Sequence, residues 1–286
     1  MALRSPLLNV MTQAALKAAK GLIRDLGELE QLQVSKKGPA DYVSRADRRA
    51  EDILRAELVK ARPAYGLLME ESGAVAGSDT SNRWIVDPLD GTTNFLHGIP
   101  HFAISIALER DGEPFAGVIY NPVPDEMYVA ERGSGAFLNG RRLRVSGRRV
   151  VDEALFATGI PFKGLPDHPQ FLLQLARVMA ISSGVRRFGA AALDLAYVAA
   201  GRYDGYWENG LNPWDIAAGM VLVREAGGFV TDLDGGRTMF SGGGICAGSS
   251  TMHAELLRLI AAAKADAKAA DGIAGPPAAD AGSSPP

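Results

Sequence analysis

Residues 101–140 contain three or four short apolar or alternating runs separated by turn signals, and this pattern strongly constrains the fold. The segment reads HFAISIALERDGEPFAGVIYNPVPDEMYVAERGSGAFLNG. Asp-Gly, Asn-Pro and Gly-Ser-Gly interrupt the runs, and Asn139-Gly140 is a dipeptide typical of a tight hairpin turn. Because short turns join antiparallel neighbours, the segment predicts an antiparallel meander sheet.

Helices are predicted ahead of this meander. Apolar residues from Leu8 to Leu26 recur at helical spacing, so the first element is expected to be an amphipathic helix. Ser44 is expected to cap a second helix, with Asp47 at its third position. The runs AYGLLME and RWIVD then predict two short buried strands.

The pattern changes after about residue 150, where predicted helices and strands alternate up to a last helix over 252–264. A second sheet with alternating helices follows, and the whole chain is predicted to be a layered α/β (α+β) protein. We divide it into an N-terminal subdomain over 1–150, a C-terminal subdomain over 151–265 and a disordered tail over 266–286. The tail is rich in alanine, proline and glycine and has few large apolar residues.

Composition excludes several classes of protein. The net charge is −3 with no long basic stretch, so no nucleic-acid partner is expected. The cluster between Arg141 and Arg149 is interpreted as a solvated hairpin, with a weak RNA or protein contact as the alternative. The single cysteine, Cys246, lies in an apolar run and excludes an internal disulfide. The chain has no long apolar run and no recognisable signal peptide. We therefore expect a cytoplasmic location and no membrane association.

The stretch WIVDPLDGTTNF, residues 84–95, places two carboxylates at the end of an apolar strand. Asp87 is expected in a loop after that strand, and Asp90 follows three residues later. Two carboxylates held so close are costly unless a cation lies between them, and an oxygen-only ligand set suits Mg²⁺ or Mn²⁺. Gly91 and the threonines after it can cradle a phosphate with backbone amides and hydroxyls. A plain β-turn is the competing interpretation.

Further acids follow the same pattern, and each also has a purely structural explanation. The strand before Glu70 and Glu71 ends in LLMEES, which could be an exposed loop. Asp215 in NPWDIAAG lies in the first turn of a helix, where a carboxylate offsets the helix dipole without any ligand. Glu208 follows the strand YDGYW and could accept sugar-like hydroxyls or simply be solvated. Together these acids resemble a distributed oxygen cage for a phosphatase metal centre.

These segments together resemble the inositol monophosphatase family of the lithium-sensitive sugar-phosphatase superfamily. Its signatures correspond to WIVDPLDGTTNFLHGIP and NPWDIAAGMVLVREAGGFVTD, and the likeness extends over about residues 7–263. The resemblance implies an α-β-α-β-α fold, hydrolysis of inositol-1-phosphate by metal-activated water, inhibition by Li⁺ and a homodimer. Histidinol phosphate, 3′-phosphoadenosine 5′-phosphate or a sugar phosphate such as fructose 1,6-bisphosphate stay open as substrates. So does a regulatory, transcription-associated binding role.

The resemblance also implies roles for individual residues. Two or three Mg²⁺ ions would be bound, with Mn²⁺ as a possible substitute. Their ligands would be Glu70, Asp87, the Leu89 carbonyl, Asp90 and Asp215. The third ion would be weaker and would lie near Glu70. Glu70 and Thr92 would orient the attacking water, and Asp47 would polarise Thr92.

The substrate side of the site is likewise implied by the resemblance. The residues expected to contact substrate are Leu89, Asp90, Gly91, Thr92, Arg186, Gly189, Ala190, Ala191, Glu208 and Asp215. Of the neighbouring Arg186 and Arg187, one is expected at the substrate and the other at a dimer contact. Lys36 is expected on a mobile loop near the metals, and His97 and His101 are expected to be structural or near the entrance.

Overall fold

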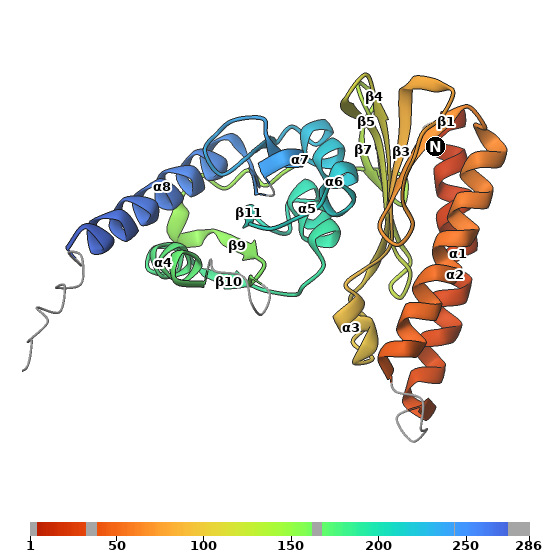
Figure 1. Cartoon of the computed structure of the whole chain (residues 1–286). Coiled ribbons are helices and arrows are strands. Elements are labelled where there is room, and N and C mark those ends of the chain that lie inside the picture. The colour runs from red at the N-terminus through yellow and green to blue at the C-terminus, as the bar shows by residue number, and fades with distance from the viewer. Residues whose placement is uncertain (1–4, 33–38, 162–167, 243, 274–286) are drawn as a thin grey trace, which may run out of the picture.

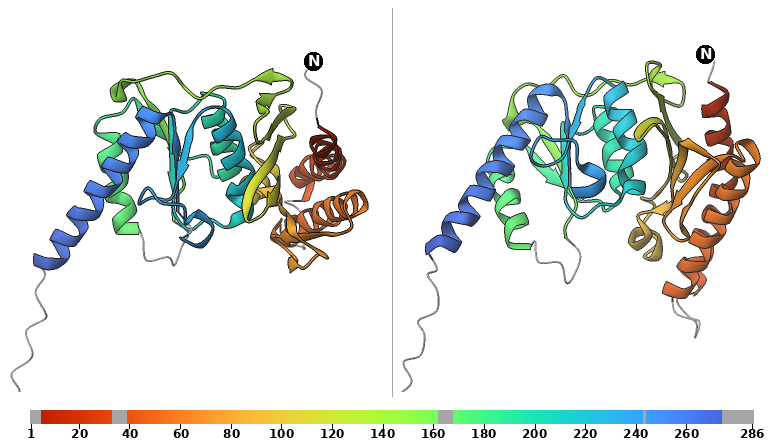
Figure 2. Two further views of the ribbon diagram at one scale, coloured as in Figure 1. Left: turned by 90° about the horizontal axis from the view of Figure 1, so that it is seen from above. Right: turned by 45° about the horizontal axis from the view of Figure 1, so that its top comes forward.

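Helices and sheets alternate in five layers, in the order helix, sheet, helix, sheet, helix (Figure 1). The computed structural model describes residues 5–32, 39–161, 168–242 and 244–273. Lys36 and the end of the predicted tail, 274–286, lie outside the described residues. Figure 2 shows the same succession of layers from two further directions. The layered α/β fold predicted from the sequence is therefore confirmed.

The first sheet has eight strands in the order β2-β1-β3-β4-β5-β6-β7-β8. From β3 onwards each strand pairs antiparallel with the next, as the meander predicted, whereas β1 lies parallel to β3. Asn139 and Gly140 both have positive φ and close the predicted hairpin. The strands are β1 (Tyr65–Met69), β2 (Gly73–Val75), β3 (Asp79–Asp90), β4 (Ala103–Arg110), β5 (Glu113–Asn121), β6 (Glu126–Glu131), β7 (Gly135–Leu138) and β8 (Arg141–Arg142).

Two long helices, α1 (Pro6–Leu32) and α2 (Pro39–Ala61), cover the outer face of this sheet (Figure 2). Their apolar faces are buried, with Met11 and Leu54 fully inaccessible. The helix predicted around Leu8–Leu26 is confirmed, but the predicted cap at Ser44 is wrong. The second helix begins earlier, at Pro39, because proline is well tolerated at a first helical position.

The second sheet has five strands in the order β10-β9-β11-β13-β12. Its outer face is covered by α4 (His168–Met179) and α8 (Ser250–Ile273). The short 3₁₀ helix η1 (Val151–Glu153) leads into it, and α7 (Met239–Gly242) precedes its last strand in the chain. The strands are β9 (Leu155–Thr158), β10 (Gly184–Arg186), β11 (Gly205–Glu208), β12 (Phe229–Thr231) and β13 (Ile245–Gly248). Cys246 is buried in β13, as predicted.

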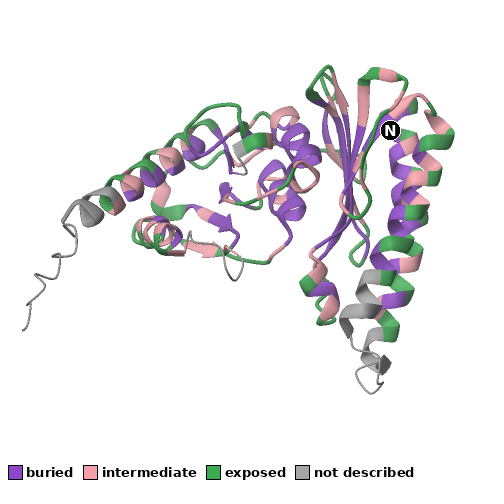
Figure 3. Ribbon diagram, viewed as in Figure 1, coloured by how far each residue is buried: buried purple, intermediate pink, exposed green. Residues whose placement is uncertain are grey.

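Between the sheets lie α5 (Ala191–Ala199) and α6 (Pro213–Glu225), which are buried along most of their length (Figure 3). Their many small residues allow close packing: a Cβ at Gly117 of β5 would lie 2.5 Å from the Ala218 carbonyl oxygen. One apolar cluster contains Ile85 from the first sheet, these helices and Tyr206 from the second. The sheets are formed on either side of residue 150, yet they share a core, and the division into subdomains stays a prediction.

The last helix is longer than predicted. It continues to Ile273, so the predicted disordered tail from residue 266 is wrong over its first eight residues, 266–273. Alanine and lysine are strong helix formers and extend a helix without a buried face. Asp266 also forms an ion pair with Arg177 of α4. Among the described helices, none combines the length and apolar character needed to cross a membrane.

Candidate active site

A bulge in β3 brings Asp87 and Asp90 into one cavity. Residues three apart in a regular strand point to opposite faces. Here Asp87 pairs with Ser105 and Asp90 pairs with Ala103, so three residues of β3 span two of β4. The extra residue of the bulge turns the Asp87 and Asp90 side chains towards the same side of β3, and both carboxylates line a cavity of about 350 Å³. The prediction of a loop after Val86 is wrong, because β3 continues through the bulge to Asp90.

The cavity lining is strongly acidic. It contains five carboxylates and one guanidinium group, that of Arg187. Burial, followed by repulsion between neighbouring carboxylates, raises the pKa values of Asp87 and Asp90 well above their usual range. The carboxylates of this lining are those of Glu70, Asp87, Asp90, Glu208 and Asp215. Such a cluster of oxygen donors is costly in water-free surroundings unless cations offset it.

The two acids of β3 are held by backbone amides. The Leu89 N–H donates to Asp87 Oδ1 at 2.8 Å, and the Ala192 N–H donates to Asp90 Oδ2 at 2.8 Å. Ala192 lies in the first turn of α5, where amides have no acceptor within the helix. Asp90 therefore links the end of β3 to helix α5.

Glu70 follows β1 and faces Asp87. A hydrogen bond joins their side chains, and Glu70 Oε2 is buried with no partner among the described residues. Burial, more than the neighbouring Glu71 and Glu51, raises the pKa of Glu70. The unsatisfied oxygen is available to a cation or to a water molecule.

Asp47 lies on α2 beside these acids but does not line the cavity. Burial, and then repulsion from Glu70, raises its pKa to about 8. The Thr92 hydroxyl donates to the Leu89 carbonyl oxygen at 3.0 Å, and the described residues show no bond between Asp47 and Thr92. The predicted polarisation of Thr92 by Asp47 stays a prediction.

Gly91 starts the short helix α3 (Thr92–Leu96) in a left-handed conformation, with φ 91°. A Cβ at this position would lie 3.0 Å from the His101 carbonyl oxygen and 3.3 Å from the Ala190 Cβ, so glycine is required. Gly91, Thr92 and Thr93 all line the cavity next to the two aspartates. This places the predicted phosphate cradle beside the carboxylate cluster.

Asp215 approaches the same cavity from α6. Its carboxylate accepts the Asn212 N–H at 2.6 Å in a capping box that begins the helix. Burial raises its pKa to about 6. The structural interpretation, an acid at a helix N-terminus, is thus correct, and it coexists with a position in the acidic cluster.

Glu208 also lines the cavity and interacts electrostatically with Asp90 and Asp215. It is the last residue of β11, and the buried Tyr206 hydroxyl donates to it. Burial raises its pKa to about 7. Gly159 and Gly189 line the cavity alongside it, which leaves room for a hydroxylated ligand.

The structure distinguishes the two arginines that the sequence left open. Arg187 lines the cavity, whereas Arg186 is exposed on edge strand β10, bonds the Val185 carbonyl oxygen and does not line it. Successive residues of an extended chain point in opposite directions, so only one can face the site. Ala190 is buried beneath Gly91 and is also absent from the lining, whereas Ala191 is present.

Sequence reasoning missed several lining residues. Asn94 lies in α3, and its side-chain amide donates to the Phe188 carbonyl oxygen at 2.7 Å, which fixes the segment before α5. Gly159 and Asn212 were also missed. Two sequence features could have indicated these residues. Asn94 comes directly after the two threonines, and Gly159 comes directly after strand β9.

The donor set fits divalent cations. Asp87, Asp90, Glu70 and Asp215 offer only oxygen atoms, and Leu89 lines the same cavity. No three acidic, histidine or cysteine side chains in the described ranges are gathered closely enough to hold an ion by themselves. The remaining ligands would therefore come from the backbone, water or substrate.

Comparison with known proteins agrees with this geometry. A model of the inositol monophosphatase family matches residues 3–265. The chain belongs to the inositol monophosphatase family. The resemblance inferred from the sequence is therefore confirmed, and the chain is assigned to a family of phosphatases.

Three similar proteins illustrate the range of this family. An inositol-1-monophosphatase from Mesorhizobium japonicum is 63% identical over 90% of this chain and 97% of its own length. A Nus factor SuhB from Pseudomonas aeruginosa is 45% identical over 89% of this chain and 96% of its own. The crystal structure of an extragenic suppressor protein suhB from Bartonella henselae superposes with a TM-score of 0.84 at 60% identity, covering 90% and 98% of the two chains.

Proposed function

We propose that this inositol monophosphatase family member hydrolyses inositol-1-phosphate to inositol and phosphate with Mg²⁺. The carrying observation is the 350 Å³ cavity, whose lining brings together the carboxylate cluster, the glycine and threonines of the predicted phosphate cradle, and Glu208. With cations bound among these carboxylates, the cavity would match a phosphate dianion, and Glu208 would match the hydroxyl groups of a polyol. The name of the Mesorhizobium relative supports the same substrate.

In this proposal, Mg²⁺ bound to Glu70, Asp87, Leu89 O, Asp90 and Asp215 would offset the phosphate charge and lower the pKa of a coordinated water. The amides of Gly91 and Thr92 hold the phosphate oxygens. Glu70, whose Oε2 has no partner among the described residues, and the Thr92 hydroxyl orient the attacking water. Glu208 accepts hydrogen bonds from the polyol hydroxyls, and Arg187 contributes the only positive charge among the described lining residues.

The finer properties of the metal centre are also proposals. Two or three ions bind per site, with Mn²⁺ as a substitute, and Li⁺ inhibits at the second metal position, between Asp87, Asp90 and Asp215. We further propose a homodimer with a cytoplasmic location, in line with the family resemblance.

A substrate panel tests the assignment. The kcat/KM of the wild-type protein with Mg²⁺ is measured on inositol-1-phosphate, histidinol phosphate, 3′-phosphoadenosine 5′-phosphate and fructose 1,6-bisphosphate. We expect the cyclitol phosphate to be preferred, because Glu208 can accept hydrogen bonds from ring hydroxyls and the Mesorhizobium relative is named for this substrate. A higher kcat/KM for any other member would replace inositol-1-phosphate as the assigned substrate.

A transcription-associated role is a second candidate, because relatives at 43–45% identity are named Nus factor SuhB. The intact acidic cluster favours catalysis, since a purely binding protein would not need such costly neighbouring charges. An Asp90→Asn protein used as bait in its own cell lysate separates the roles. Recovery of transcription proteins together with negligible wild-type turnover on the whole panel would make the binding role the leading one.

A further inference from the structure

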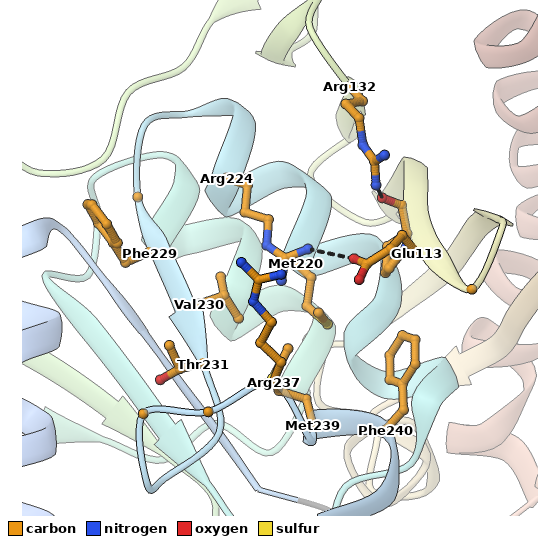
Figure 4. A pocket seen from close by; sticks show the side chains of 15 residues that line it. Glu113, Arg132, Met220, Arg224, Phe229, Val230, Thr231, Arg237, Met239 and Phe240 are labelled. Atoms are coloured by element: carbon orange, nitrogen blue, oxygen red, sulfur yellow. Dashed lines mark hydrogen bonds and ion pairs between the residues drawn. The ribbon is translucent and has the colours of Figure 1, made fainter.

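A second and larger cavity, of about 700 Å³, lies at the other end of α6 (Figure 4). It shares no lining residue with the acidic cavity. Asp215 lies in the first turn of α6 and Arg224 in the last turn, which separates them by about 14 Å along the helix axis. The two cavities are therefore separate sites joined by one rigid element.

Three arginines line this cavity, against a single glutamate. Arg224 contributes from α6, Arg237 from the loop after β12, and Arg132 from the turn after β6. Figure 4 shows the guanidinium groups of Arg224 and Arg237 side by side, with Glu113 on the other side of Arg224. Burial, and then repulsion from Arg132 and Arg237, lowers the pKa of Arg224. An anion between these guanidinium groups would offset their repulsion, and guanidinium groups bind phosphate and carboxylate with paired hydrogen bonds.

The carboxylates within reach leave this positive charge unbalanced. Glu113 lies 3.7 Å from Arg224 and is half exposed, so the pair is weak. Glu225 accepts the amides of Gly133 and Gly135 instead. Asp232 accepts three backbone amides and a hydroxyl within the loop that carries Arg237. Among the described residues, Arg237 has no carboxylate partner.

A helix-terminal role explains only part of the cluster. Arg224 offsets the dipole at the carboxyl end of α6. Arg132 donates to the Pro114 carbonyl oxygen at 3.1 Å, which holds its side chain over β5. Neither argument accounts for Arg237, which is exposed at the cavity without any bonded partner in the described part of the chain.

The rest of the lining is apolar and in part aromatic. Met220, Val230 and Met239 are buried at the base, and Phe240 packs beside them. Phe229 is 52% exposed, but its ring lies on the opposite side of β12 from Val230 (Figure 4) and contacts the His253 ring, with 6.1 Å between the centroids. The cavity therefore offers a cationic end and a surface that suits a flat ring, in a volume typical of small-molecule sites.

We propose that this cavity binds a ligand of the mononucleotide class, with its phosphate between Arg224 and Arg237 and its base against Phe240 and the methionine side chains. The phosphate dianion offsets the excess charge of the arginines, and two guanidinium groups can bind it bidentately. The site does not depend on the catalytic assignment, since it uses none of the same residues.

Isothermal titration of the full chain with adenosine 5′-monophosphate in EDTA tests the proposal. Chelation keeps the acidic cavity without cations, so its carboxylates repel the phosphate there. We expect saturable binding that Arg237→Gln weakens by about tenfold or more, the scale of a charge-assisted hydrogen bond. The matched control is Arg141→Gln, which removes the same charge from an exposed hairpin position and should change the affinity by less than about twofold.

Adenosine and inorganic phosphate, titrated separately, should each bind more weakly than the mononucleotide. Four results would overturn the proposal: no saturable binding to the wild type, equal binding by Arg237→Gln, equal binding of either half-ligand, or binding of a single-stranded oligonucleotide but not of the mononucleotide. Arg237 is exposed, so its replacement should leave the fold intact, and a melting curve of each variant verifies this.

Discussion

The carboxylate of Glu208 occupies the space that a side chain at Gly159 would need. A Cβ at Gly159 would lie 1.9 Å from both Glu208 Cδ and Oε1. The end of β9 and the end of β11 lie next to each other in the second sheet, since the two strands are parallel neighbours. The absence of a side chain at one strand end thus fixes the position of the acid at the other.

Gly159→Ala should therefore displace Glu208 and impair polyol binding. We expect the KM for inositol-1-phosphate to rise about tenfold, with a smaller change in kcat, and a loss of about 1–3 kcal/mol in unfolding free energy from overpacking. Steady-state kinetics and denaturant unfolding measure both. Gly21→Ala is the control, because a Cβ there meets nothing within 4 Å. An unchanged KM in Gly159→Ala would show that Glu208 does not contact the polyol.

Asp194 of α5 is predicted to be protonated in the folded protein. Both carboxylate oxygens are buried without a partner among the described residues, and burial raises the pKa well above its usual range. Asp194→Asn replaces a neutral acid by a neutral amide, so the melting temperature at pH 7 should change little. Asp204→Asn is the contrast: Asp204 is buried, accepts the Leu155 N–H and pairs with Arg148, so its replacement should cost about 3 kcal/mol. A comparable loss in Asp194→Asn would mean that Asp194 is ionised.

Stability of the metal-free protein should fall as pH rises. Burial raises the pKa of Asp215 from 3.8 to about 6 and that of Asp47 from 3.8 to about 8. The folded state therefore binds more protons than the unfolded chain, and the stabilisation present below pH 4 is lost as pH rises through these two values. Calorimetry in EDTA between about pH 4 and 8 checks the slope. Excess Mg²⁺ should raise the melting temperature most at the upper end, and a metal-free melting temperature that rises across this window would contradict the assignment.

The sequence was most informative where local chemistry decides the structure. Asn139-Gly140 adopts positive φ at both residues because few other dipeptides can, and so the meander could be predicted. The cap and first turn of α6 were predictable for the same reason, since Asn212 and Pro213 are typical of a helix start.

Features that depend on distant partners could not be predicted from the sequence. The bulge between Asp87 and Asp90 is set by pairing with β4, and the orientation of Arg187 towards the cavity depends on where β10 ends. The bond from Ala192 to Asp90 joins segments 102 residues apart. The cluster of Arg132, Arg224 and Arg237 likewise forms only when the turn after β6, helix α6 and the loop after β12 meet in the fold. No sequence motif predicts it.

The central claim is that acids from separate elements bind divalent cations that make phosphate ester hydrolysis possible. Mg²⁺ titration calorimetry of Asp90→Asn, combined with phosphate release from inositol-1-phosphate, tests it most directly. Asp152→Asn is the matched control, because Asp152 is exposed and remote from the cavity. The account predicts that Asp90→Asn keeps the fold but loses both Mg²⁺ affinity and at least about a hundredfold in turnover, while the control retains both. Full activity and unchanged Mg²⁺ affinity in Asp90→Asn would contradict it.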